Sequence, residues 1–334
     1  MSSKHCTVKD IARAAGVSLS TVSYSLRNNA RIPAATRQRI QAVAESLGYR
    51  RNPHIAALMS VIGRGRKVRT VENIALIWPH GTRHAVQTED FCRDIVKGVE
   101  NRAQSLGFGV VQFFMEEDGL SGARISTILA TRNIRGLIFS PALHGPSLAP
   151  SLDWSRFVTV ALGHAQWTPE MHRCMSNHYH AVRLCLDRLA QSGAKRPAAI
   201  FSNEINQRTD FSQEASFLTH HPQPAHARKL IYFVHNRDFS GIFRWLETSK
   251  ADSVIYGTRW MYKACLDLDR DTTAKYRPVT LDWGSRTERI PGIKFRYDLI
   301  AESAVDLLAT QLHTNEVGVP DRARRLSLHG DWID

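Results

Sequence analysis

The sequence predicts a helical N-terminal domain of helix-turn-helix type, a short hinge helix, and a larger module of two α/β subdomains. Two observations support this prediction. The first sixty residues hold three stretches with helical spacing of apolar residues, separated by Gly16 and by Arg31-Ile32-Pro33. From residue 74 onward, short apolar runs alternate with amphipathic stretches, an order typical of parallel sheets covered by helices.

Positive charge is concentrated near the N-terminus. Residues 1–70 carry 13 Lys and Arg against 2 acidic residues, whereas the remaining 264 residues carry 31 against 29. A basic segment that also has an apolar helical pattern indicates a folded domain with a polyanionic partner rather than a solvated, disordered tail.

The first helix is predicted to begin at Thr7, because Thr-Val-Lys-Asp resembles a capping box with Asp in place of Glu. Gly16 should end it, and Ser18 can cap the second helix. A third helix follows Pro33 and should end at Gly48. The faces expected to pack together are Val8, Ile11, Ala12 and Ala15; then Val17, Val22 and Leu26; then Ile40, Val43, Ala44 and Leu47.

Two short helices joined by a glycine turn and braced by a third form the helix-turn-helix plan, in which the second helix lies in the DNA major groove. Its outward residues would be Leu19, Ser20, Ser23 and Tyr24, with Thr21 near the phosphates. Hydroxyl groups suit this task because they both donate to phosphates and exchange hydrogen bonds with base edges. A purely structural three-helix bundle would show the same apolar pattern.

The segment TVKDIARAAGVSLSTVSYSLRNNARIPAATRQRIQAVAESLGYRRNP resembles the DNA-binding headpiece of the lactose-repressor (LacI-type) family of bacterial transcription regulators. The matching motifs are V-x-D-I-A-x-x-A-G-V-S-x-x-T-V-S and T-R-x-R-I-x-x-x-A-x-x-L-G-Y, and the resemblance extends over residues 7–62. It implies a homodimer that binds a pseudo-palindromic operator in double-stranded DNA.

The resemblance places Leu19 and Ser20 at the family's two specificity positions. Tyr24 stands where the family usually has an arginine able to contact guanine, and a tyrosine cannot make that bidentate contact. The base read at this point is therefore expected to differ. The full set of DNA-binding residues that the resemblance implies is Thr7, Ser18, Leu19, Ser20, Thr21, Ser23, Tyr24, Asn28, Arg51, Asn52, Ala56 and Leu58.

Pro53 is a suitable first residue for a hinge helix with an apolar side. In the family that this chain resembles, the hinge helices of a dimer pair in the minor groove and wedge a leucine between base pairs. Leu58 has the corresponding spacing from Tyr49. The basic, glycine-containing segment 63–69 then reads as a connector. The expected domains are residues 1–52 (DNA binding), 53–72 (hinge and linker) and 73–334 (effector binding and dimerisation).

The α/β pattern continues to the C-terminus, with amphipathic helices predicted over residues 90–106 and 121–132. It is similar to the effector module of the same family, which resembles type I periplasmic sugar-binding proteins. SNHYHAVRLCLDRLAQSGAKRPAAI and IPGIKFRYDLIAESAVDLL are the blocks that carry this similarity. The predicted strands are Ile74–Trp78, Val110–Phe114, Gly136–Ser140, Val158–Leu162, Ala198–Phe201, Leu230–Phe233, Ser253–Tyr256 and Val279–Leu281.

Ligands of open α/β sheets bind beyond the carboxyl ends of the strands. Arg208 and Asp282 fall where the similar family carries effector-binding residues, although Thr258-Arg259 replaces its Asn-Asp pair. Aromatic rings beside charged groups suit a sugar, whose apolar face stacks on rings while its hydroxyls take hydrogen bonds. The candidate effector-binding residues are Phe91, His164, Arg208, Trp260, Asp282 and Trp283.

Other functions remain open at this point: a regulator answering to a non-sugar effector such as a nucleobase, or a sugar-binding or sugar-processing α/β protein. The sequence has no G-x-G-x-x-G after a strand, no G-x-x-x-x-G-K-[ST], no G-x-S-x-G and no H-E-x-x-H. We therefore expect a protein that is not an enzyme and needs no cofactor.

The cysteines indicate the compartment. They are odd in number, scattered and without metal-ligand spacing, so we expect reduced thiols and no metal site. The N-terminus has no apolar signal core, and no apolar run is long enough to cross a bilayer. A cytoplasmic protein with no membrane partner is the expectation. The five cysteines are Cys6, Cys92, Cys174, Cys185 and Cys265.

Overall fold

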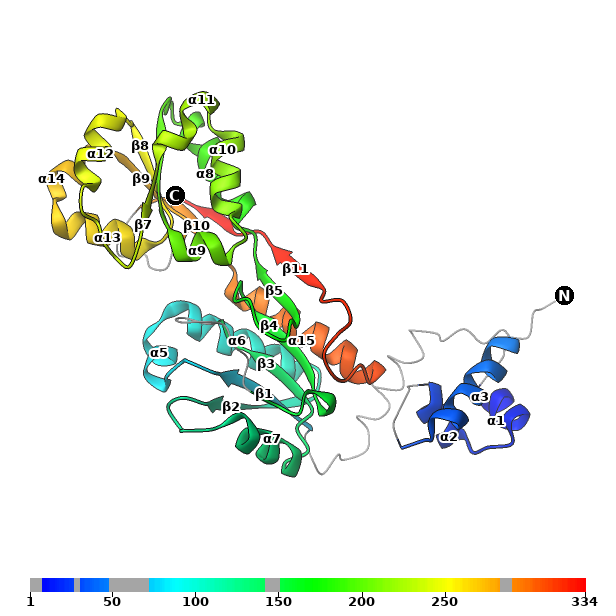
Figure 1. Ribbon diagram of the computed structural model, residues 1–334. Helices are drawn as coiled ribbons and strands as arrows, with labels where there is room; N and C mark the ends of the chain where they lie inside the picture. The colour runs from blue at the N-terminus through cyan, green and yellow to red at the C-terminus, as the bar shows by residue number, and fades with distance from the viewer. Residues whose placement is uncertain (1–7, 27–30, 48–71, 142–150, 283–289) are drawn as a thin grey trace.

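The computed structural model describes residues 8–26, 31–47, 72–141, 151–282 and 290–334. They form a three-helix N-terminal domain and two α/β subdomains, each built on its own sheet (Figure 1). The predicted fold class, a helix-turn-helix headpiece followed by a two-subdomain α/β module, is confirmed.

The headpiece consists of α1 (Val8–Ala15), α2 (Leu19–Leu26) and α3 (Ala34–Ser46). One residue from each helix, Ile11, Val22 and Ile40, is fully buried and centres the core. Leu47 differs from the prediction, because its side chain is 41% exposed. It occupies the C-cap position after α3, where the chain leaves the helical path that would have turned it inward.

The N-terminal subdomain contains a parallel sheet in the order β11-β5-β4-β3-β1-β2. Its strands are β1 (Glu72–Trp78), β2 (Phe108–Phe114), β3 (Gly136–Phe139), β4 (Val158–Leu162), β5 (His172–Ser176) and β11 (Arg325–Leu328). Its helices are α5 (Arg83–Thr88), α6 (Asp90–Ser105), α7 (Gly122–Thr131), η1 (Trp154–Arg156) and α15 (Tyr297–Thr314).

The C-terminal subdomain contains a sheet in the order β12-β10-β9-β8-β6-β7, parallel except for the β10–β12 pair. Its strands are β6 (Pro197–Ser202), β7 (Ile231–Val234), β8 (Ser253–Tyr256), β9 (Arg277–Thr280), β10 (Gly292–Lys294) and β12 (Asp331–Ile333). Its helices are α8 (His178–Gln191), α9 (Asn203–Arg208), α10 (Ser212–His220), α11 (Pro224–Ala227), η2 (Arg228–Leu230), α12 (Ile242–Ser249), α13 (Arg259–Leu268) and α14 (Arg270–Thr273).

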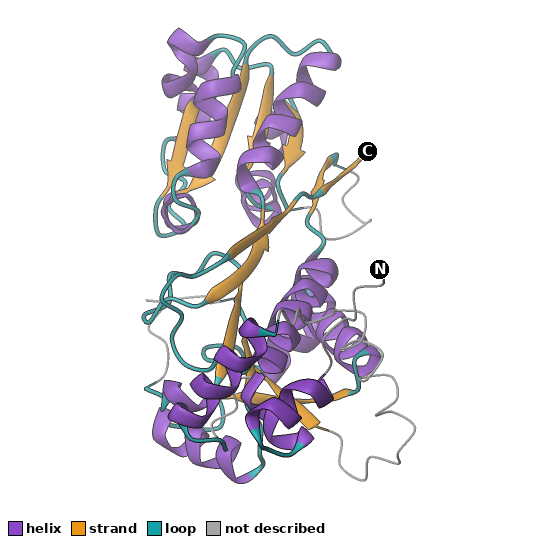
Figure 2. Cartoon of the chain, turned by 90° about the vertical axis from the view of Figure 1, so that its right-hand side faces the viewer, coloured by secondary structure: helices purple, strands orange, loops and turns teal. Residues whose placement is uncertain are grey.

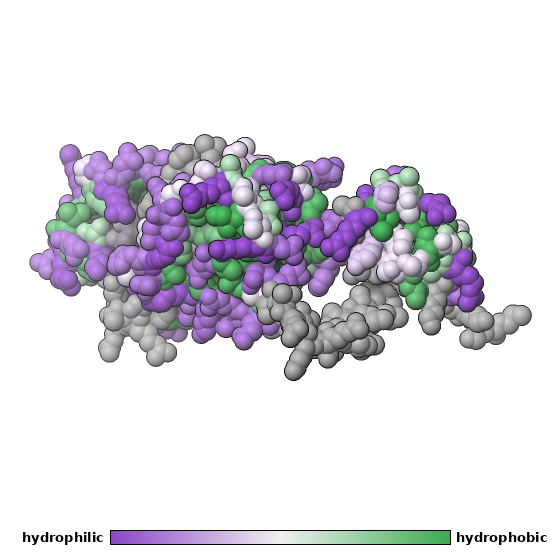
Figure 3. Space-filling model, turned by 90° about the horizontal axis from the view of Figure 1, so that it is seen from below, coloured by the Kyte–Doolittle hydropathy of each residue, from purple (hydrophilic) through white to green (hydrophobic). Residues whose placement is uncertain are grey.

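Each sheet is covered on both faces, as Figure 2 shows for the C-terminal subdomain at the top. Alternate residues of β1 serve opposite cores: Leu76 packs towards α6 and α15, whereas Ile77 packs towards α7. In β6, Phe201 and Ile200 divide in the same way between the α8–α10 side and the α12–α13 side. Burial of both faces explains why these strands read as continuous apolar runs. The surface seen in Figure 3 is mostly polar, with scattered apolar residues.

The chain passes between the subdomains three times in the described residues: from β5 to α8, from β10 to α15, and from β11 to β12. Ring contacts bind these crossings together. His178 of the first crossing contacts Phe295 of the second, with ring centroids 4.8 Å apart. His180 at the start of α8 stacks on His329 of the third crossing at 3.7 Å, with the rings nearly parallel. The three connections therefore form one joint.

The sequence located every long apolar strand but missed β5, β10, β11 and β12. Strand β5 reads His-Arg-Cys-Met-Ser, yet His172 and Arg173 are about 95% buried. Both side chains have partners outside the strand: Arg173 Nη1 donates to the carbonyl of Ala165, eight residues earlier, at 2.7 Å, and the Arg324 amide donates to His172 Nδ1 at 2.8 Å, while the buried Arg173 Nε has no partner among the described residues. The strand therefore has no run of apolar residues that would have predicted it.

Helices α6 and α15 approach closely because Gly98 has no side chain. A Cβ at this position would lie 2.3 Å from the Asp298 carbonyl oxygen and 2.9 Å from Ala301 Cβ. We predict that Gly98→Ala destabilises the protein by about 1–3 kcal/mol through overpacking, measured by denaturant unfolding. Lys97→Ala, on the exposed side of α6, is the control. A more stable Gly98→Ala protein, as helix propensity alone would give, contradicts this packing.

Candidate nucleic-acid interface and ligand site

Helix α2 is presented by a tight turn after α1. Gly16 adopts a φ of 64°, a left-handed conformation that favours glycine, and the Val17 amide donates to the Ala12 carbonyl at 3.0 Å. Ser18 caps α2, since its Oγ accepts a hydrogen bond from the Thr21 amide at 3.1 Å. The predicted cap is therefore present, and the turn fixes the direction in which α2 leaves α1.

One side of α2 is buried and the other is available to a partner. Val22 and Ser25 are fully buried, and Gln41 of α3 donates to the Ser25 carbonyl at 3.2 Å. On the opposite side Leu19 is 47% exposed and Ser20 is exposed, while Thr21 and Tyr24 are half-buried. The residues predicted to read bases thus lie on the outward side of a helix held by the other two.

The hydroxyl groups at the start of α2 form a small network. Ser18 Oγ lies 2.8 Å from Ser20 Oγ and 2.8 Å from Thr21 Oγ1, in addition to accepting from the Thr21 amide. One hydroxyl can donate once and accept twice, so these three contacts use all of its hydrogen-bonding capacity. A phosphate contact by Ser18 would have to replace one of them.

Other predicted DNA-binding residues lie outside the described residues, namely Thr7, Asn28, Arg51, Asn52, Ala56 and Leu58, as does the whole hinge. Ser23 belongs to α2. These assignments remain predictions.

The described ligand candidates lie at the carboxyl ends of strands or at the joint between the subdomains. His164 follows β4, Arg208 ends α9 after β6, and Asp282 follows β9. Phe91 lies in the first turn of α6, and Trp260 in the first turn of α13 after β8. Trp283 lies outside the described residues.

A chain of aromatic and imidazole rings connects two of these candidates through the joint. Phe91 contacts Tyr297 (centroids 5.7 Å apart), Tyr297 contacts Phe295 (6.0 Å), and Phe295 contacts His178 (4.8 Å). His178 in turn contacts His164 at 4.8 Å. The chain begins and ends in the N-terminal subdomain and passes through residues of the first and second crossings.

Burial keeps both imidazoles at this joint neutral, and each ring has hydrogen-bond partners. His164 Nε2 donates to the Ser176 carbonyl at 2.8 Å. His178 Nδ1 accepts from the Gln213 side-chain amide at 3.1 Å, which leaves its Nε2 to donate to Ser176 Oγ at 3.3 Å. Burial, reinforced by nearby cations, lowers the pKa of His164 to about 4 and the pKa of His178 well below 6.5. Arg208 is one of those cations for both rings.

Asp282 lies in a setting that opposes its negative charge. Burial raises its pKa, Arg259 acts in the opposite direction, and Glu89 and Asp90 at the start of α6 raise it further. Its charge in turn raises the pKa of Tyr297, after the larger effect of burial. Asp282 is therefore electrostatically coupled to both subdomains at once, next to the ring chain.

Trp260 has different surroundings. It is 36% exposed, contacts Phe239 edge-on at 5.8 Å, and lies under the Arg237 guanidinium at 5.2 Å. These residues come from the ends of β7 and β8, so they belong to the carboxyl edge of the C-terminal sheet. Trp78 at the end of β1, by contrast, is fully buried and stacks on Phe114, which makes it a core residue.

Sequence reasoning missed Tyr297, His178 and Phe239 as neighbours of these candidates. Each of them lies shortly after the end of a strand, but only Phe239 follows a strand that the sequence predicted. Tyr297 and His178 adjoin β10 and β5, two of the strands that went unpredicted. Their position could have been inferred only by finding those strands.

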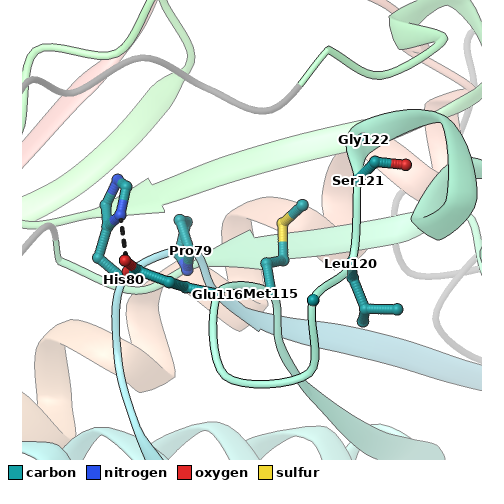
Figure 4. Close-up of a pocket in the computed structure, with 8 residues that line it drawn as sticks. Pro79, His80, Met115, Glu116, Leu120, Ser121 and Gly122 are labelled. Carbon is teal, nitrogen blue, oxygen red and sulfur yellow. Dashed lines mark hydrogen bonds and ion pairs between the residues drawn. The ribbon is translucent and has the colours of Figure 1, made fainter.

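An open pocket of about 510 Å³ lies at the carboxyl edge of β1 and β2. Figure 4 shows Pro79 and His80 on one side of it and the Met115–Gly122 loop on the other, with His80 Nδ1 3.3 Å from Glu116 Oε2. None of the predicted ligand-binding candidates in the described residues lines it.

The described residues contain no group of three or more His, Cys, Asp or Glu side chains placed to hold a metal ion, and no helix long and apolar enough to cross a membrane. Within the same residues, four cysteines are buried and none forms a disulfide: Cys92, Cys174, Cys185 and Cys265.

The described residues thus join a helix-turn-helix domain, the fold of many DNA-binding proteins, to a two-sheet α/β module. Residues 7–52 match the profile described as "Bacterial regulatory proteins, lacI family". The headpiece is a lacI-family helix-turn-helix domain, and the chain is similar to LacI-type transcriptional regulators.

Comparisons with individual proteins agree. The chain is 29% identical over 147 residues to the HTH-type transcriptional regulator DegA of Bacillus subtilis (strain 168), a match spanning 44% of this chain and 40% of DegA. The fold is similar to that of the transcriptional regulator CelR in its cellobiose complex (TM-score 0.58, 19% identity, 99% of both chains). It is also similar to the lac repressor dimer bound to operator and the anti-inducer ONPF (0.52, 17% identity, 99% and 98%).

The neutral imidazoles generate a pH prediction. His164 has a pKa of about 4 in the folded protein and about 6.5 when unfolded, so the unfolded state binds more protons between these values. Stability is therefore complete above pH 6.5 and falls as the pH drops towards 4. We predict that His164→Gln recovers roughly 1–3 kcal/mol of the acid-side loss, measured by denaturant unfolding at pH 4.5 and 7.

His84→Gln is the control for this prediction, because that ring is exposed on α5. If His164→Gln loses as much stability on acidification as the wild type, His164 is not held neutral as described.

Proposed function

We propose that the protein is a sequence-specific DNA-binding transcriptional regulator, most simply a repressor, controlled by a small molecule. The main support for DNA binding is the outward side of α2, where Leu19 and Ser20 are exposed within a lacI-family headpiece. The charge of residues 1–70, 13 basic against 2 acidic, supports attraction to phosphates. Tyr24 reads a base other than the guanine that an arginine there would select.

The proposed DNA-bound form is a homodimer on a pseudo-palindromic operator. A two-fold symmetric site matches a two-fold symmetric protein, with one α2 in each half-site. Asn52 and Leu58 are proposed to act in the minor groove, where an apolar wedge would kink the duplex. The lac repressor, to which the fold is similar, is a dimer on its operator.

The proposed effector is a sugar bound between the subdomains, near Phe91, Arg208 and Asp282. Rings from both sides of the joint offer apolar faces, while Asp282 and Arg208 offer charged hydrogen-bonding groups. CelR, the similar protein described above, was solved with cellobiose. Stacking rings would serve a nucleobase equally well, and that is the alternative effector. The proposal gives the protein no catalytic role.

Control follows from differential binding. An effector that prefers one angle between the subdomains shifts the population towards that angle, and the three crossings carry the change to the N-terminal side of the module. In a dimer this would move the two hinge segments relative to each other and change the spacing of the two α2 helices.

We predict that the full chain binds duplex DNA at least about tenfold more weakly at ~200 mM than at ~50 mM salt, because bound phosphates release counterions. A double Leu19→Ala, Ser20→Ala variant should keep this salt dependence but enrich no sequence from a random duplex pool. The measurement is fluorescence anisotropy, followed by sequencing of the selected DNA.

Residues 73–334 alone provide the control, and this fragment should show the helical circular dichroism of the α/β module without binding DNA. DNA binding of equal strength by that fragment, or unchanged selection by the double variant, would refute the role given to the headpiece.

A further inference from the structure

The turn between α9 and α10 reaches across to the other subdomain. Asp210 and Phe211 both adopt left-handed conformations, with φ of 52° and 58°. The turn is fastened from within, because buried Asn206 accepts from the Phe211 amide through its carbonyl and from the Glu214 amide through its side chain. A turn held in this way projects Asp210 in a fixed direction.

Asp210 contacts two elements of the N-terminal subdomain. Arg325 Nη1 of β11 donates to Asp210 Oδ2 at 3.1 Å, and the Gln166 side-chain amide donates to Asp210 Oδ1 at 3.2 Å. Arg325 Nη2 also donates to Glu170 Oε1 at 3.0 Å, within the N-terminal subdomain itself. Arg325 therefore has one acidic partner on each side of the subdomain border.

The loss of the Asp210 contact should cost more than the loss of an isolated surface ion pair, because it also changes the charge balance around a buried arginine. Arg173 of β5 lies directly beside Arg325 in the strand register and is 4% exposed. Its pKa is lowered by burial and then by the charge of Arg325, while Glu170 and Asp210 act in the opposite direction. Two arginines thus face two carboxylates, and without Asp210 the N-terminal subdomain is left with one uncompensated positive charge.

The same turn holds residues of the proposed ligand site. Arg208 lies two residues before Asp210 and influences both His164 and His178. Gln213, two residues after Phe211, donates to His178 at the first crossing. A displacement of this turn would therefore alter the ligand site and the cross-border contact together.

We propose that Asp210, with Arg325 and Gln166, forms a clasp that holds the subdomains in the arrangement described here and through which ligand binding near Arg208 is coupled to the angle between them. The regulatory meaning of the clasp rests on the proposed function. The clasp is a positioning device: Asp210 ties the turn that follows Arg208 to the N-terminal subdomain, and its release permits other subdomain angles.

The test measures the subdomain angle without ligand or DNA. Spin labels are attached at two exposed positions, Thr127→Cys on α7 and Lys263→Cys on α13. Pulsed electron paramagnetic resonance then measures the distance between the two labels. The full chain carries Cys6→Ser, and labelled protein is diluted in unlabelled protein so that each pair lies within one chain. Asp210→Asn and Arg325→Gln should each increase the fraction of molecules outside the main label-to-label distance by about two- to fivefold, as expected for the loss of a partly exposed ion pair.

Glu170→Gln is the matched control. It removes a carboxylate from the same arginine but leaves the cross-border contact in place, so the distance distribution should stay as in the wild type. The double Asp210→Asn, Arg325→Gln variant should shift no further than Asp210→Asn alone, because the ion pair that Arg325→Gln breaks is already lost in that variant. Melting temperatures of all variants confirm that they are folded.

Two results would overturn the clasp: an Asp210→Asn distribution identical to that of the wild type, or a Glu170→Gln shift as large as that of Asp210→Asn. Either result leaves the DNA-binding proposal standing, since that proposal is tested through the headpiece.

Discussion

The three chain crossings between the two sheets are the constraint on which the arrangement of this molecule depends. Because His178 contacts Phe295 and His180 stacks on His329, the crossings behave as one joint rather than three independent linkers. We expect a joint of this kind to allow rotation of one subdomain against the other while resisting their separation. The proposed ligand residues lie at or beside it, so a ligand bound there would act at the pivot, where small contacts bias the angle most directly.

The joint contains buried polar groups, most of them with hydrogen-bond partners, although Arg173 Nε, His180 Nδ1 and Gln213 Oε1 have none within the part of the chain that the structure describes. His164 and His178 share Ser176 as a hydrogen-bond partner, and the buried Arg173 depends on carboxylates that come partly from the other subdomain. A buried polar group is costly when a partner moves away. The joint is thus sensitive to the relative position of the subdomains in a way that an apolar interface would not be, which suits a switch between discrete arrangements.

How far the sequence predicted this architecture depended on where each element finds its partners. Strands β1, β2 and β8 are apolar on both faces and were evident from composition, and the α2 cap at Ser18 followed from local chemistry. Strand β5 was not predicted because it buries the polar residues His172 and Arg173, and His172 accepts its hydrogen bond from Arg324, 152 residues away. The short strands β10 and β12 exist through pairing with each other and with β9.

The candidate site shows the same division. His164, Arg208 and Asp282 could be found because they follow strands that the pattern revealed, whereas Tyr297 and His178 adjoin strands that it did not. The contact between Asp210 and Arg325 joins residues 115 positions apart, and no local signal marks it. The DNA-reading role predicted for α2 came from the resemblance to a known family. Hydroxyl groups on an exposed helix serve many functions, and only the spaced motif around them indicated DNA binding.

We propose that ligand binding at the joint and DNA binding by the headpiece are linked. The most direct measurement takes a sugar or nucleoside that raises the melting temperature of the full chain but not of Asp282→Asn, and determines DNA affinity with and without it. Linkage predicts that DNA affinity changes by about five- to 150-fold and that DNA changes the ligand's affinity by the same factor. A ligand that stabilises the protein through Asp282 yet leaves DNA affinity unchanged would contradict the claim.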